Sequence, residues 1–150
     1  MKKFQFRLEP VLKLRKYKER MAQMELAKAQ AALQECRTML EKSKIQEESA
    51  RRDWDSGLQK GMWETEFRMY ADHIRGLELQ TKRTVENELR LQDVVEQRRE
   101  DLMKVTVGRK SMDLLRDERF NQYLLETGRM EQKETDELAN LHRSSQERLE

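Results

Sequence analysis

Glycine, proline, cysteine and long apolar runs are all scarce in this 150-residue chain, which has five glycines, one proline and one cysteine. The single cysteine, Cys36, excludes an intrachain disulfide and suits a reducing compartment. No apolar run approaches the roughly 20 residues that span a bilayer. No continuous apolar stretch follows the basic N-terminus, so a signal peptide is not expected. These absences favour a cytoplasmic location.

Thick-cored globular folds are also excluded by composition. The chain is 40% charged and 36% hydrophobic, whereas an ordinary globular domain is about 25% charged and about 45–50% apolar. Disordered polyampholytes and long helices with a narrow apolar face both tolerate such a composition. Because strong helix formers dominate and helix breakers are rare, long helices are favoured. The net charge of +2 does not indicate a nucleic-acid or membrane partner.

The few helix breakers divide the chain into two helical segments. Pro10 is compatible only with the first turn of a helix, which predicts a first helix over about residues 10–55. The stretch 56–62 contains Gly57 and Gly61 and is the best candidate for a turn. Both glycines are expected to help reverse the chain there.

Two apolar rows occupy the predicted first helix, and they are offset as though the register shifted near residue 25. The first row consists of Leu14, Tyr17, Met21 and Met24, and the second of Leu26, Ala29, Leu33, Cys36 and Leu40. The second row weakens toward Trp54. A buried position within this row is therefore the plainest interpretation of Cys36.

The second helix is expected over about residues 62–145, and its apolar residues repeat every 3.5 positions. The row starts at Trp63 and continues through Phe67, Tyr70, Ile74, Leu77, Thr81, Thr84, Glu88, Leu91, Val95, Arg98, Leu102 and Val105. Such a repeat is typical of a coiled coil. A short turn would make the helices antiparallel neighbours. The predicted fold is all-α, an antiparallel coiled-coil hairpin whose longer C-terminal helix overhangs beyond about residue 110.

Groups that could perform catalysis do not cluster in the sequence. His73 and His142 lie far apart and form no zinc-like spacing with Cys36. The sequence has no glycine-rich phosphate loop. The many acidic pairs are those of a solvated helix face. We therefore expect no enzyme activity, no cofactor and no metal site.

Two stretches have compositions typical of partner binding. Trp54, Trp63, Phe67 and Tyr70 gather around the predicted turn, where they either pack the end of the hairpin or form interface anchors. Residues 1–20 contain eight Lys or Arg against two Glu. That local excess is either an ordinary solvated helix end or a surface for an acidic partner.

Three sequence stretches resemble the FliJ family, a family of components of the flagellar type III export apparatus. They are "FQFRLEPVLKLRKYKER" near the N-terminus, "KAQAAL" within the first helix and "GRMEQKETDELANLHR" near the C-terminus. The last stretch is the most telling. Its matching positions are Arg129, Met130, Glu131, Gln132, Lys133, Asp136, Glu137 and Ala139.

The resemblance implies a non-catalytic protein similar to the central stalk of rotary ATPases. Its expected partners are the hexameric export ATPase, the cytoplasmic domain of the export gate membrane protein, and export chaperones. It would be cytoplasmic, peripherally associated with the export apparatus at the inner membrane. No nucleic-acid partner is implied, and the chain is expected to be monomeric by itself.

The resemblance, together with the residues expected to lie outside the packed repeat, assigns residues to the two main partners. The residues expected to bind the export gate are Trp54, Trp63, Phe67, Tyr70, His73 and Leu77. Those expected to bind the export ATPase are Arg7, Lys13, Arg129, Met130, Gln132 and Lys133. On the first helix, the polar Ser43 and Gln46 depart from the aromatic and aliphatic gate-binding surface of the family.

Two alternatives remain open from the residues alone. A generic coiled-coil scaffold or chaperone would homodimerise through the repeat over residues 63–105. A basic coiled coil that binds nucleic acid would do so through non-specific charge attraction that moderate salt abolishes.

Overall fold

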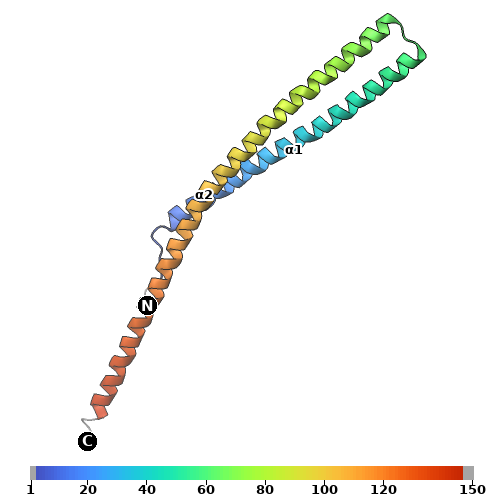
Figure 1. Ribbon diagram of the computed structural model, residues 1–150. Coiled ribbons are helices and arrows are strands. Elements are labelled where there is room, and N and C mark those ends of the chain that lie inside the picture. The colour runs from blue at the N-terminus through green and yellow to red at the C-terminus, as the bar shows by residue number, and fades with distance from the viewer. Residues whose placement is uncertain (1–2, 147–150) are drawn as a thin grey trace. The chain divides into compact units, whose positions relative to one another are not determined.

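The computed structural model describes residues 3–146, which form two helices, α1 (Glu9–Lys60) and α2 (Glu64–Gln146) (Figure 1). α1 has 52 residues and α2 has 83. The described residues contain no strand. The helices pack against each other as an antiparallel hairpin. The all-α fold and the longer C-terminal helix predicted from the sequence are confirmed.

Contacts within the chain define two compact units, each built from part of both helices. The hairpin unit is Arg20–Lys104, and the terminal unit combines Met1–Glu19 with Val105–Glu150. The hairpin unit contains the turn between the helices. The terminal unit contains the start of α1 and the C-terminal part of α2.

In the hairpin unit, one face of α1 is buried at alternating steps of three and four residues. The buried members of this face are Ala29, Leu33, Cys36, Leu40, Ser43 and Ala50. This spacing keeps one narrow stripe facing a partner helix. The sequence row from Leu26 to Leu40 is therefore confirmed, and Cys36 is buried as predicted.

The facing stripe of α2 matches the predicted 3.5-residue repeat. Ile74 and Val95 are buried, and Val95 packs in a cluster with Ala29 and Leu33. Two polar members of the repeat also contact α1: Thr81 Oγ1 donates to Glu47 Oε2 at 3.2 Å, and Glu88 Oε1 accepts from Arg37 Nε at 2.9 Å. Most of the repeat that a homodimer would need is therefore at least partly covered in the single chain, whereas Trp63, Phe67 and Arg98 are exposed.

The register shift expected in α1 is wrong. Leu14, Tyr17 and Met24 are all more than half exposed, and Met21 is 38% exposed. Leu12, which is fully buried, and the partly buried Arg15, Glu19 and Ala22 continue the 3-4 spacing of the buried face instead. The buried face of α1 is continuous. It could not be recognised from the sequence because two of its positions, Arg15 and Glu19, are polar.

The turn is also shorter and later than predicted. α1 continues through Gly57 to Lys60, and the non-helical connection between the two helices consists of residues 61–63. Gly61 has a positive φ of 88°, a conformation that a Cβ disfavours. Gly57 has a different role, since a Cβ there would lie only 2.5 Å from Cε of Met62. The absence of a side chain lets Met62 fold over the end of α1.

In the terminal unit, α2 is covered further along than expected. Met112 is buried, and partial burial continues to Tyr123 and Thr127. The covering chain is the start of α1 together with residues 3–8, which run along α2 before α1 begins. From Gly128 to Ser144 every residue of α2 is exposed. An overhang therefore exists, but it begins near Gly128 and not near residue 110.

Candidate partner-binding surfaces

The turn presents a large exposed apolar surface, which we call the tip surface: Leu58, Trp63, Phe67 and Met69. Trp63 is 80% exposed and Met69 71% exposed. Trp63 precedes α2, so it does not belong to the packed repeat in which the sequence row placed it. Gly61 allows the sharp reversal that leaves the Trp63 ring in solvent.

Trp54 and Phe67 pair across the turn. Their ring centroids lie 5.3 Å apart with a tilt of 56°, a favourable aromatic geometry. Trp54, one of the residues predicted to bind the gate, is half-buried, and its Nε1 has no hydrogen-bond partner among the described residues. Trp54 therefore supports the tip surface from within, and Phe67 remains 43% exposed.

The remaining residues predicted to bind the gate lie along α2 beyond the tip. Tyr70 and Leu77 are half-buried, and His73 is exposed. Tyr70 therefore packs at the end of the hairpin, which is one of the two interpretations of the sequence. His73 faces solvent. Leu58 was missed because it lies in the stretch that was predicted to be a turn.

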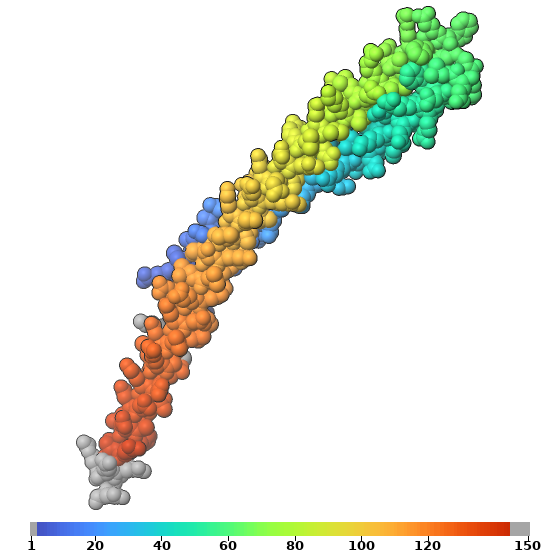
Figure 2. Space-filling view, viewed as in Figure 1, coloured from blue at the N-terminus to red at the C-terminus, as the bar shows by residue number. Residues whose placement is uncertain are grey.

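The residues predicted to bind the ATPase all lie in the terminal unit, and we call them the terminal surface: Arg7, Lys13, Arg129, Met130, Gln132 and Lys133. Each is exposed. Met130, Leu138 and Leu141 are 65%, 61% and 62% exposed on the overhang. In Figure 2 the overhang is a single column of side chains. A helix with this much uncovered apolar surface suits a partner that encloses it.

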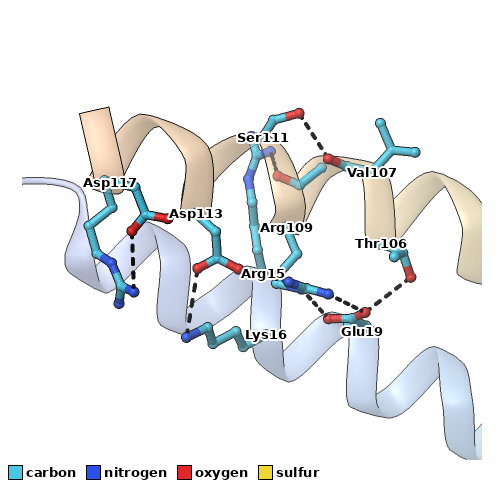
Figure 3. A network of polar contacts seen from close by, with 11 residues as sticks. Arg15, Lys16, Glu19, Thr106, Val107, Arg109, Ser111, Asp113 and Asp117 are labelled. Atoms are coloured by element: carbon cyan, nitrogen blue, oxygen red, sulfur yellow. Dashed lines mark hydrogen bonds and ion pairs between the residues drawn. The ribbon is translucent and has the colours of Figure 1, made fainter. Parts of the chain in front are cut away.

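A network of charged side chains ties α1 to α2 within the terminal unit (Figure 3). Arg109 donates from Nε to Glu19 Oε2 at 2.6 Å and from Nη2 to Glu19 Oε1 at 3.2 Å. Its Nη1 donates to Asp113 Oδ2 at 2.7 Å. Thr106 Oγ1 donates to Glu19 Oε1 at 3.1 Å. One guanidinium therefore holds two carboxylates, one from each helix.

Arg15 makes a second link in the same region. Its Nη1 donates to the carbonyl oxygen of Gly108 at 2.7 Å, and a Cβ at residue 108 would lie 3.1 Å from that nitrogen. The absence of a side chain at Gly108 therefore leaves room for the guanidinium of Arg15, and the apolar repeat is interrupted at this position. These polar pairs specify which part of α2 lies against the start of α1, because a shift of either helix would leave the charges without partners.

The network lowers the pKa values of its two carboxyl groups. Hydrogen bonding from Arg109 is the main cause of the lowered pKa of Glu19, and Thr106 contributes. Hydrogen bonding from Arg109 also dominates at Asp113, where Lys16 and Arg116 lower the pKa further. Both carboxylates are thus stabilised in their charged forms.

Acid should weaken the terminal unit through these two groups. A folded-state pKa below the ordinary values of 4.5 for Glu and 3.8 for Asp contributes stability that is present above those values and is lost as the pH falls through the folded-state pKa. Glu19→Gln should therefore lower the urea midpoint at neutral pH and reduce the fall in that midpoint between about pH 5 and about pH 3. The control is Glu96→Gln, which removes an exposed pair with Arg99. An unchanged pH dependence in Glu19→Gln would contradict the assignment.

Comparison with known proteins decides the family. The model of the flagellar FliJ protein family matches residues 4–148. The chain belongs to the FliJ family. It is therefore a component of the type III protein export apparatus with a place in flagellum biogenesis, and its family is non-catalytic. The resemblance seen in the sequence motifs is confirmed.

A solved structure shares the fold of this FliJ-family chain. It is described as a YscO homologue from Chlamydia trachomatis, is 21% identical, covers 99% of this chain and 100% of its own, and superposes with a TM-score of 0.57. No curated protein matches the sequence. Within residues 3–146, neither helix contains a stretch long and apolar enough to cross a bilayer. The same residues hold no cluster of three or more metal-ligating His, Cys, Asp or Glu side chains.

Proposed function

We propose that this FliJ-family chain binds and activates the hexameric export ATPase in the manner of a stalk, and couples it to the export gate. It acts without catalytic chemistry of its own. It also escorts export chaperones, and it works in the cytoplasm at the inner-membrane export apparatus. The hexameric ATPase and the cytoplasmic domain of the gate membrane protein are its two main partners.

The observation that carries the ATPase proposal is the uncovered part of α2. Met130 and Leu138 expose more than half of their surfaces, and every residue from Gly128 to Ser144 is exposed. A single amphipathic helix is marginally stable in water. Enclosure by a ring would cover its apolar residues, and the flanking Arg129 and Lys133 supply charge for contacts at the rim.

The observation that supports a gate partner is the exposure of the tip surface. Aromatic and methionine side chains are typical anchors of protein interfaces. Trp63 and Met69 are 80% and 71% exposed, and the packed Trp54–Phe67 pair lies beside them. His73 extends the same proposed contact along α2.

Replacing Arg129 and Lys133 together by alanine tests the ATPase surface. We expect stimulation of ATP hydrolysis to require a several-fold higher concentration of the variant, because two charges at the proposed rim are lost. Binding to the gate domain should not change. The matched control is Arg99→Ala with Lys104→Ala, which removes two exposed charges from α2 in the hairpin unit. If both double variants activate the ATPase like the wild type, Arg129 and Lys133 do not contact it.

A further inference from the structure

Residues 3–8 lie against α2 without being part of either helix. We call this segment the strap. Phe4 is its anchor: its ring lies 5.2 Å from that of Phe120 in an edge-to-face arrangement and 5.5 Å from that of Tyr123. The rings of Phe120 and Tyr123 are themselves stacked, with centroids 6.4 Å apart. Phe4 therefore sits in an aromatic slot on α2.

The strap is loosely packed outside its anchor. A hollow lies on one side of it, lined by Leu8, Leu115 and Tyr123 among others, and a second lies on the other side, next to Pro10 and Phe120. Phe120 remains 42% exposed although Phe4 rests on it. Few buried contacts therefore oppose the detachment of the strap.

The hydrogen bonds of the strap backbone are made toward α1. Phe6 O accepts from Glu9 N at 3.1 Å, and Leu8 O accepts from Leu12 N at 2.9 Å. These bonds close the first turn of α1, and Leu12 is fully buried. The strap is consequently hinged at a fixed helix start, while aromatic packing retains its far end on α2.

The aromatic slot is continuous with the proposed ATPase surface. Phe120, Tyr123, Thr127 and Met130 follow one another at steps of three, four and three, so they share one face of α2. The strap covers the first half of this face, and Met130 is the start of the uncovered half. A partner that packs along Met130 and extends toward Phe120 must therefore take the place of Phe4.

We propose that the strap is a displaceable cap: Phe4 fills the slot in the free chain, and an apolar side chain of the ATPase replaces it on binding. This inference rests on the proposed function, because the export ATPase is taken to be the partner that competes with Phe4 for the slot. Closure of the strap lowers the apparent affinity by the fraction of time for which the slot is filled.

The first test uses the free chain. The strap contains a trypsin site after Arg7, which is exposed. Phe4→Ala should accelerate cleavage there several-fold, because the segment loses its anchor. Gln5→Ala, an exposed neighbour in the strap, should leave the rate unchanged. Equal cleavage rates in Phe4→Ala and the wild type would overturn the role of Phe4 as the anchor.

The second test measures binding of the full-length chain to the purified ATPase. Phe4→Ala should bind about threefold more tightly or better, since the competitor is weakened, and Phe120→Ala should bind more weakly. Weaker or equal binding of Phe4→Ala would overturn the cap, because the strap would then be part of the contact or irrelevant to it. A wild-type chain that does not bind would overturn the proposed function itself, so the two failures are distinguishable.

Discussion

Leu33→Ala is expected to lower the free energy of unfolding by about 2–5 kcal/mol. Leu33 is buried in the cluster that joins Ala29 to Val95 across the two helices. A two-helix seam has only one line of such residues, and the helices expose most of their remaining surface. The cavity left by the truncation can be filled only by movement of the helices themselves. Urea unfolding followed by circular dichroism measures the change.

Met39→Ala is the matched control, because Met39 lies on the same stretch of α1 and is 54% exposed. Surface substitutions of this kind usually change stability by within about 0.5 kcal/mol. A loss at Leu33 no larger than the loss at Met39 would show that the two helices are not held together by the predicted seam.

Trp63→Ala is expected to weaken binding to the export gate domain by roughly 30-fold, the effect of an interface anchor worth about 2 kcal/mol. The ring is 80% exposed, so its removal should not alter the unfolding midpoint. ATPase stimulation should also be unchanged, because the ATPase is proposed to bind the terminal unit. Calorimetric titration with the purified cytoplasmic domain of the gate measures the affinity.

Leu89→Ala serves as the control for Trp63, since Leu89 is a 57% exposed apolar residue of α2 in the same unit. It should bind the gate domain normally. If Leu89→Ala and Trp63→Ala weaken binding equally, the effect comes from general surface hydrophobicity and the tip surface has no special role.

The fold could be predicted from the sequence because the repeat in α2 is long and mostly apolar. Ile74 and Val95 lie on the repeat and are buried, so the repeat identifies the face of α2 that packs. The scarcity of glycine and proline predicts that the segment is helical. The buried row of α1 between Leu26 and Leu40 followed for the same reason. A narrow seam needs only one apolar residue every three or four positions, and the sequence supplies it.

Polar residues in the seam explain where sequence reasoning failed. Arg15 and Glu19 occupy packed positions because Gly108 and Arg109 are placed to receive them, and such long-range pairing cannot be recognised from periodicity. The apolar pattern pointed instead to Leu14 and its neighbours, which are exposed.

The turn was misplaced for a comparable reason, since Gly57 is both a helix breaker and a residue that accommodates close packing. The structure shows that Gly57 stays within α1 and makes room for the side chain of Met62. The position of the strap on α2 depends on Phe120 and Tyr123, more than 110 residues away in the sequence, so the local pattern around Phe4 could not predict it. The assignment of gate and ATPase residues remains a prediction.

Stimulation of the cognate export ATPase by the purified chain tests the central claim most directly. Hydrolysis should be measured at near-physiological salt with increasing amounts of the wild-type chain, together with the oligomeric state of the ATPase. We expect saturable stimulation of hydrolysis and promotion of ring formation by the ATPase. A chain that neither binds the ATPase nor changes its rate under these conditions would contradict the stalk function.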